Sequence, residues 1–450
     1  MRVLDRFIGS RTAFHVVFAI LLFVPHLFGS RESPDPYKFG VPRIHSGDEP
    51  HYLVFIHSII DDGDLSLANN YENVHKGSED AGYLFRGTAL NHHAIWFVGD
   101  RRVHWWEAFD QEGTWGKDAE GHPFPLPRKG FDPALMPVVE RPWNAAGLPL
   151  LLSPCFWVLK KVGLGQWMEP FATILSGIAV LVASFFWRIL VSAFTKDRRV
   201  VNLSMALAFL GTPAWHYGRS FFSEPYLICI VIGAYAFALA RRSFVVAGFL
   251  VGMALFIKPI ALLMGLPIGV LLLVRRDVGG AIRFYVPVGL WLGALLVQNA
   301  MLYGSPFHMS NKFVAGLIVS NGIALLAHPT RGILSTAPIV LVAVLGWGTL
   351  MKVSRDTIAP LVACIAFFLI VAYNFAWSGG FAYSARFLVP LMPLFCLGVV
   401  PLLKSRFRRG VLLLGALSIL INGLAAVHYW RAFQNHPILY MIDSTDRPSS

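Results

Sequence analysis

At two places in the chain, carboxylates lie beside apolar runs, where their chemistry differs from that of surface acids. Asp48 and Glu49 form an adjacent pair just before one apolar stretch, and Glu224 stands just before another. A carboxylate between water and apolar surroundings can act as a general base, and two carboxylates can share a divalent cation. We predict that Asp48, Glu49 and Glu224 are catalytic, and that Asp48 with Glu224 binds Mg²⁺, Mn²⁺ or Zn²⁺.

The same carboxylates also suit the start of a helix. Ser46 and Glu49 have the spacing of a capping box, and Pro50 and Pro225 are typical of a first helical turn. The capping and catalytic interpretations are compatible, because a helix N-terminus orients the carboxylates that it holds.

Four single cations stand at the ends of apolar runs where membrane topology does not call for them. Arginine binds phosphate oxygens with a planar fork and lysine binds them as a point charge, so these cations predict a phosphate site. Ordinary snorkelling toward the interface is the alternative interpretation for each one alone. The four are Arg219, Lys258, Arg331 and Arg386.

Aromatic and imidazole side chains near these charges are candidates for substrate binding. His51 and Tyr52 follow the acidic pair, and Trp377 and Tyr383 precede Arg386 in a glycine-containing segment. Aromatic faces beside an arginine suit stacking on a sugar ring or covering a lipid phosphate. An interfacial aromatic belt explains Trp377 equally well.

The elements that must position these residues are mainly apolar. Hydrophobic residues make up 55% of the chain and charged residues 14%, with a mean hydropathy of +0.57. Soluble domains carry about 25% charged residues, so an all-α polytopic membrane protein is predicted. The net charge of +12 does not indicate a nucleic-acid partner, because the cations form short clusters between apolar runs and act there as topology signals.

Span lengths and loop charges predict the topology. A membrane-spanning helix needs about 20 mostly apolar residues. Eleven candidates lie near 12–28, 168–193, 200–217, 225–240, 243–258, 259–274, 284–303, 332–350, 358–376, 387–403 and 411–430. With a cytoplasmic N-terminus, every cytoplasmic loop is basic, as the positive-inside rule requires.

The long polar segment between the first two spans is predicted to be extracytoplasmic. The organisation is then a first helix over 1–28, this loop over 29–167, spans two to eleven over 168–430 and a short outer tail over 431–450. Apolar stretches near 49–60 and 145–159 are too short to span and are predicted to be interfacial helices. Residues 63–140 are assigned no particular fold.

The order of these features resembles the GT-C superfamily of polyprenyl-phosphate-sugar glycosyltransferases, which includes protein O-mannosyltransferases and the lipid A aminoarabinose transferase. An uncleaved first span followed by an acidic pair at the head of a large outer loop carries the resemblance. The other matching segments are RPWNAAGLP (141–149), FSEP (222–225), Lys258, YGSPF (303–307), HPTRG (328–332) and WSGGFAYSAR (377–386).

The resemblance implies a membrane glycosyltransferase in the bacterial inner (plasma) membrane. A polyprenyl-phosphate-linked sugar would be the donor, and a glycan, lipid or protein at the outer face would be the acceptor. Asp48 would act as the base or as a metal-side carboxylate, Glu224 would assist, and the four cations would hold the phosphate. Two alternatives stay open: a transporter or flippase of a lipid-linked sugar, and a glycan ligase or polymerase that uses a pyrophosphate-linked donor.

Overall fold

The structure is a computed structural model. It describes residues 8–27, 44, 48–67, 69–70, 94–98, 101–104, 115–117, 123–125, 139–142, 145–308, 315–374, 376–380, 382–428 and 436–438. Ser46, most of the predicted loop 63–140 and most of the predicted tail 431–450 lie outside these residues.

The chain divides into two compact units. The larger unit contains Met1–Arg43, Pro170–Leu292 and Phe313–Ser450, and the smaller contains Ile44–Glu169 and Gly293–Lys312. Within the described residues, four helices are long and apolar enough to cross a membrane: Gly165–Val191, Val278–Tyr303, Arg355–Tyr373 and Arg408–Val427. These four helices support the prediction of a membrane protein. The other apolar helices have 10–17 residues, and the predicted total of eleven spans stays a prediction.

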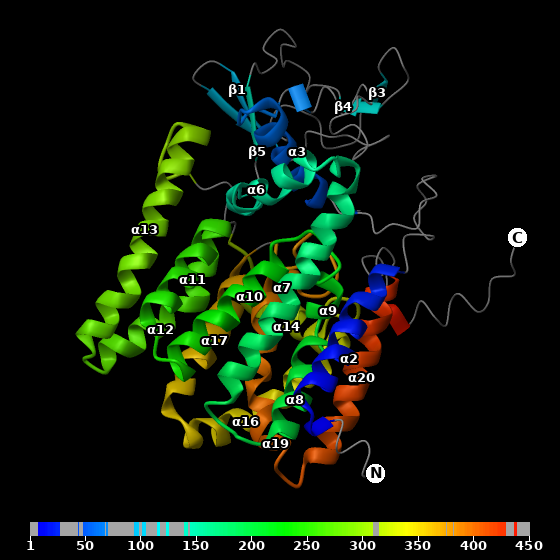
Figure 1. The fold of residues 1–450 in the computed structure, drawn as a ribbon, viewed down its shortest axis with the longest axis vertical. Helices are drawn as coiled ribbons and strands as arrows, with labels where there is room; N and C mark the ends of the chain where they lie inside the picture. Colours follow the sequence, from blue (N-terminus) through cyan, green and yellow to red (C-terminus); the bar gives the residue numbers. More distant parts are fainter. Residues whose placement is uncertain are drawn as a thin grey trace, which may run out of the picture. The chain divides into compact units, whose positions relative to one another are not determined.

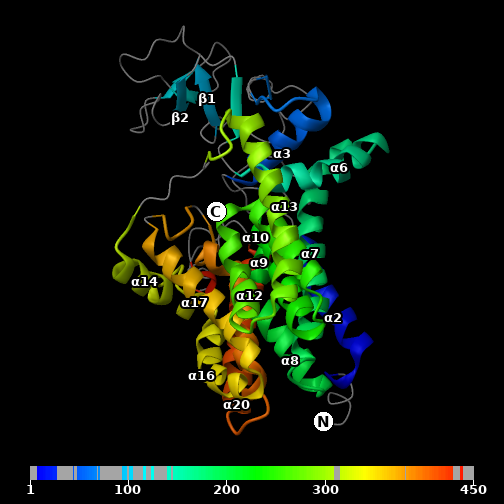
Figure 2. The ribbon, with the colours of Figure 1, turned by 90° about the vertical axis from the view of Figure 1, so that its left-hand side faces the viewer.

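Helices of the larger unit run roughly alongside one another (Figures 1 and 2). In chain order its α-helices are α2 (Arg11–Phe23), α7 (Met168–Val191), α8 (Arg198–Phe209), α9 (Ala214–Tyr217), α10 (Glu224–Tyr235), α11 (Phe244–Ile257), α12 (Leu262–Val274), α13 (Val278–Tyr303), α14 (Ile318–Ala327), α15 (Ile333–Thr336), α16 (Pro338–Val353), α17 (Ile358–Tyr373), α18 (Met392–Phe395), α19 (Val399–Leu402) and α20 (Arg408–Val427). The first residues of α7 and the last turns of α13 belong to the smaller unit. Short 3-10 or π turns join several of these helices: η1 (Val24–Leu27), η6 (Ala236–Ala240), η7 (Pro259–Ala261), η8 (Arg355–Thr357), η9 (Arg386–Leu391) and η10 (Cys396–Gly398).

Two predicted spans differ in the structure, and one helix was not predicted. The span predicted over 200–217 is broken between α8 and α9, because Pro213 lacks an amide hydrogen and disfavours helical backbone at the residue before it. The span predicted over 387–403 is a series of short 3-10 and α turns, η9 to α19, and Pro390 lies within η9. Helix α14 was not predicted, since its apolar run of ten residues is below the length of a span.

Ion pairs within the larger unit show that consecutive helices run in alternating directions. Lys258, between α11 and α12, pairs with Glu224 at the start of α10. The opposite ends of these helices meet where Arg242 and Arg275 both pair with Asp356, just before α17. The turns that flank α10, α11 and α12 therefore alternate between the two ends of the bundle, as the predicted loop pattern requires for these helices.

The smaller unit joins helices to short strands. Helix α3 (Glu49–His57) continues into a π-helical turn, η2 (Ser58–Asp62), and packs against α6 (Gly147–Lys161), which the turn η5 (Gly165–Trp167) follows. Strands β1 (Ala94–Val98), β2 (Arg101–His104) and β5 (Val139–Pro142) form an antiparallel sheet in the order β2-β1-β5, and β3 (Trp115–Lys117) pairs with β4 (Pro123–Pro125). These strands were not predicted and qualify the all-α class.

Candidate functional site

Three of the predicted site residues meet in the larger unit. Lys258 Nζ and Arg386 Nε both donate to the same oxygen of Glu224, Oε1, at 3.3 and 3.1 Å. The Glu224 side chain is fully buried, that of Arg386 is 7% exposed and that of Lys258 is 20% exposed. We call Glu224, Lys258 and Arg386 the buried charge cluster, and Lys258 is its most accessible member.

Local backbone rules explain how the cluster is assembled. Pro225 suits the first turn of α10 and places Glu224 as the first residue of that helix. Pro259 ends α11, and Lys258 adopts an extended conformation with φ −152° between α11 and η7. The predicted split between two apolar runs at this lysine is therefore present as a break in the helix.

Aromatic rings line the cationic side of the cluster. The Arg386 guanidinium carbon lies 3.9 Å from the ring centre of Phe222, and Lys258 Nζ lies 4.7 Å from that of Phe387. A ring face attracts a cation while excluding water, so both rings hold the charges in an apolar setting. The cluster therefore concentrates two positive charges beside one buried carboxylate.

The turn before Arg386 has a constrained backbone. Ser384 has a positive φ of 59°, unusual for a residue with a side chain, and its Oγ lies 2.7 Å from Thr336 Oγ1. Gly379, with φ +74°, runs so close that an added Cβ would lie 2.9 Å from Arg386 Cβ. Both features fix the direction from which Arg386 enters the cluster.

The other two predicted phosphate-binding cations have different contacts. Arg219 Nη1 donates to the carbonyl oxygens of Ala426 and Val427 at 2.8 and 3.0 Å, at the C-terminal end of α20. A cation there satisfies orphan carbonyls and interacts favourably with the helix dipole, so these contacts favour a structural role. Arg331 Nη1 donates to the carbonyl oxygen of Gly380 at 2.9 Å and thereby holds the segment before Arg386.

The two predicted aromatic partners of this segment lie in different environments. Tyr383 is fully buried; its hydroxyl donates to Asn422 and its carbonyl accepts a bond from the Tyr217 hydroxyl. A substrate cannot reach this ring without displacing the core around it, so the contacts favour packing over the predicted substrate binding. Trp377 is half-buried, with its ring 5.8 Å from that of His328.

The predicted acidic pair lies in the smaller unit, at the start of α3. Asp48 occupies the N-cap position, and its side chain makes no capping hydrogen bond to the described first turn of that helix. Glu49 is the first helical residue and is fully buried, and His51 and Tyr52 are buried in the same helix. A helix is present in the predicted stretch 49–60, but Glu49 stands at its first position and not at the third, where a capping box with Ser46 would place it. The chemical roles of these four residues stay predictions.

A second polar group in the smaller unit was not predicted. His57 Nδ1 lies 2.7 Å from Asp61 Oδ2, and Lys160 from α6 contacts the other oxygen of Asp61. Burial acts to raise the pKa of Asp61, but the contacts with His57 and Lys160 outweigh burial and lower it. The i, i+4 spacing of His57 and Asp61 is a signal that the sequence offered, whereas the pairing with Lys160 is long-range.

The environment of Glu224 does not suit the predicted metal ligand. Its Oε1 faces two cations at 3.1 and 3.3 Å, and a divalent ion there would add to the positive charge. Within the described residues, no group of three or more His, Cys, Asp or Glu side chains is placed to hold a metal ion. The predicted divalent cation stays a prediction for Asp48.

Comparison with protein-family models, with curated proteins and with solved structures found no match. The resemblance to the GT-C superfamily therefore stays a prediction that rests on the sequence motifs.

Proposed function

We propose that the protein is a membrane glycosyltransferase that moves a sugar from a polyprenyl-phosphate donor to an acceptor at the outer membrane face. The buried charge cluster is the observation that carries this proposal. It gathers three separately predicted residues, two of them cations, and leaves the lysine as the accessible member. A phosphate at the level of the membrane is a suitable ligand for such cations.

The proposed reaction breaks the bond between the sugar's anomeric carbon and the donor phosphate oxygen. An acceptor hydroxyl attacks that carbon from the opposite face, Asp48 takes the hydroxyl proton, and the electron pair of the broken bond stays on the phosphate. Lys258 and Arg386 stabilise the charge that develops on this phosphate. Glu224 is the positioning residue, because it holds both cations in place.

The proposed topology puts this chemistry outside the cytoplasm. Eleven crossings, a cytoplasmic N-terminus and a location in the bacterial inner (plasma) membrane complete the proposal. The pairing of Lys258 with Glu224 at one end, and of Asp356 with Arg242 and Arg275 at the other, supports the alternation of loops on which this topology depends.

The phosphate role of the cluster can be tested with a polyprenyl phosphate that carries no sugar. Lys258→Gln is expected to weaken its binding to the purified protein roughly tenfold or more, because a charged phosphate contact is lost. Lys352→Gln is the matched control, an exposed lysine at the end of α16. Equal binding by both variants would remove the basis of the proposal.

The enzyme and flippase alternatives differ in detergent solution. An enzyme still transfers labelled sugar from donor to acceptor without a sealed membrane, whereas a flippase has no compartments to connect and leaves the donor intact. Transfer from a pyrophosphate-linked donor, but not from a monophosphate-linked donor, would identify the ligase or polymerase alternative.

Asp48 has its own test in the same transfer assay. Asp48→Asn removes the proposed base and is expected to lower the transfer rate at least about 10²-fold, with membrane insertion and donor binding kept. Full activity in this variant would assign the base to another residue. Added chelator, compared between wild type and Asp48→Asn, tests the predicted divalent cation.

A further inference from the structure

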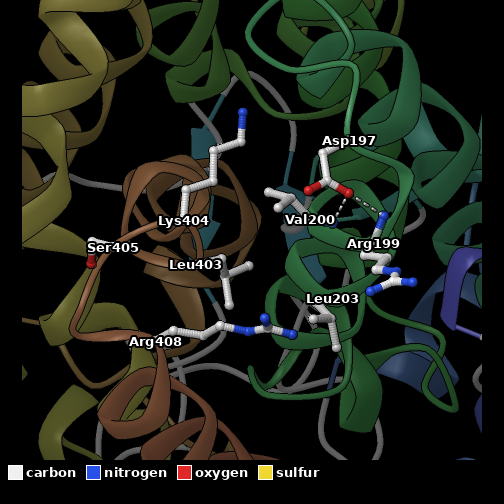
Figure 3. Close-up of a pocket in the computed structure, with 8 residues that line it drawn as sticks. All are labelled: Asp197, Arg199, Val200, Leu203, Leu403, Lys404, Ser405 and Arg408. Carbon is white, nitrogen blue, oxygen red and sulfur yellow. Dashed lines mark hydrogen bonds between the residues drawn. The ribbon is translucent and has the colours of Figure 1, made fainter. Parts of the chain in front are cut away.

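A second basic site lies at the end of the larger unit away from the buried charge cluster, in a cavity that the proposed function does not use. The cavity has a volume of about 410 Å³ between the start of α8 and the turn from α19 to α20 (Figure 3). It is lined by Asp197, Arg199, Val200, Leu203, Leu403, Lys404, Ser405 and Arg408.

Positive charge predominates in this cavity. Arg199, Lys404 and Arg408 supply three cations, and Asp197 supplies one carboxylate. Oδ1 of Asp197 accepts hydrogen bonds from the backbone amides of Arg199 and Val200 at 2.9 and 3.4 Å, so this carboxylate caps α8 (Figure 3). The cations remain in excess, and the two arginines have the planar fork that suits phosphate oxygens.

Apolar side chains also line the cavity or lie next to its lining residues in sequence. Val200 and Leu403 are buried, while Phe407, in the turn that carries three of the lining residues, is 57% exposed. Helix α20, a candidate membrane span, begins at Arg408 and exposes Leu413 and Leu417 further along. The cavity therefore stands where a charged surface gives way to an apolar one, as a headgroup with attached acyl chains requires.

We propose that this cavity binds the phosphate-bearing headgroup of an anionic membrane phospholipid. Its volume falls in the range of small-molecule sites and exceeds what a single phosphate ion needs. Arg199 and Arg408 contact the phosphate, and Lys404 adds charge. Basic pockets between membrane helices bind anionic headgroups by this physical principle. The proposal is independent of the proposed transferase activity.

The neighbouring residues provide a matched pair of variants. Arg199→Gln/Lys404→Gln/Arg408→Gln removes the three lining cations. Arg198→Gln/Arg406→Gln/Arg409→Gln removes three cations next to them in sequence that do not line the cavity. Both variants lower the net charge by three at the same end of the bundle, so general electrostatic attraction changes equally.

The experiment measures binding of a short-chain phosphatidylglycerol to the full-length protein in detergent, by native mass spectrometry and by titration. The lining variant is expected to bind at least about tenfold more weakly, because it removes all three cations that line the cavity. The flanking variant is expected to change binding by less than about twofold. Equal weakening in both variants, or none in either, would overturn the proposal.

Two further measurements identify the source of the phosphate. Phosphatidylcholine, which has no net charge, should not compete, and inorganic phosphate at matched ionic strength should displace the lipid only weakly. If inorganic phosphate binds as tightly as the lipid and depends equally on the lining cations, the assignment to a lipid is wrong. Should the triple variants fold poorly, Arg408→Gln against Arg409→Gln gives the same comparison with a single charge.

Discussion

At each end of the larger unit, one carboxylate holds two cations. Glu224 pairs with Lys258 and Arg386, and Asp356 pairs with Arg242 and Arg275. The two carboxylates are both nearly inaccessible, with 0% and 8% of the side chain exposed. Their partners differ: Lys258 and Arg386 are 20% and 7% exposed, whereas Arg242 and Arg275 are 55% and 37% exposed.

This difference in the exposure of the cations has energetic consequences. Ions removed from water lose solvation that only excellent pairing restores, so breaking a buried pair is costly. A cation that remains in water loses little when its partner is removed, and salt screens its attraction. We therefore expect breaking the Glu224 pairs to cost more stability than breaking the Asp356 pairs. The Glu224 end is suited to binding a ligand, and the Asp356 end joins three loops with a modest gain in stability.

The largest expected effect is at Arg386. Arg386→Gln leaves the buried Glu224 with less compensating charge and should destabilise the protein by about 3–5 kcal/mol, measured as a lower thermal unfolding midpoint in detergent. Arg386→Lys keeps the charge but loses the planar stacking on Phe222, and should fall between the wild type and Arg386→Gln.

A double variant shows whether this loss comes from the ion pair. Glu224→Gln/Arg386→Gln removes the carboxylate together with the arginine, so it should recover a large part of the stability that Arg386→Gln loses. If the two single losses add instead, the residues act independently and the buried charge cluster is not an energetic unit.

A smaller loss of stability is expected at the Asp356 end of the larger unit. Asp356→Asn should lower the free energy of unfolding by about 1 kcal/mol, because both of its arginines remain hydrated. Raising the salt concentration to about 1 M shortens the screening length to roughly 3 Å and should narrow the difference between variant and wild type. The Arg386→Gln difference should persist in the same salt, and similar salt sensitivity at both ends would contradict the comparison.

Hydropathy predicts long helices well and broken ones poorly. The span predicted over 168–193 matches α7, because an unbroken apolar run of that length has few alternatives to a helix. The run 387–403 is equally apolar, yet Pro390 and the residues around it impose short 3-10 and α turns. Hydropathy counts side chains, whereas the helix depends on amide hydrogens that proline lacks.

The candidate site was predicted as a set of residues and not as a set of contacts. Glu224, Lys258 and Arg386 were each singled out, because isolated charges beside apolar runs are costly and therefore informative. Their mutual pairing spans 34 and 162 positions along the chain, and no periodic pattern reports such a distance. Arg219 also shows that the sequence does not report long-range contacts, since only the folded chain places this residue against the end of α20.

A third carboxylate extends the comparison to the smaller unit. Asp61 also holds two partners, the buried His57 and the half-exposed Lys160, with 5% and 46% of their side chains exposed. Asp61 therefore combines one buried partner, like those of Glu224, with one exposed partner, like those of Asp356. Because Asp61 lies in a polar turn after α3, its protonation can be followed by changing the pH.

The smallest expected effect is a pH dependence at this turn. Burial alone would raise the pKa of Asp61, but His57 and Lys160 lower it below the ordinary value of 3.8. Since the folded pKa is the lower one, the stabilisation is fully present above pH 3.8 and is lost as the pH falls through the folded pKa. Unfolding midpoints measured from pH 6 to pH 3 should therefore fall less steeply in Asp61→Asn, which cannot ionise at this position.

Lys160→Gln, which keeps the carboxylate but removes one of its two partners, should give an intermediate slope. Identical slopes in all three proteins would show that the contacts of Asp61 do not stabilise the folded chain.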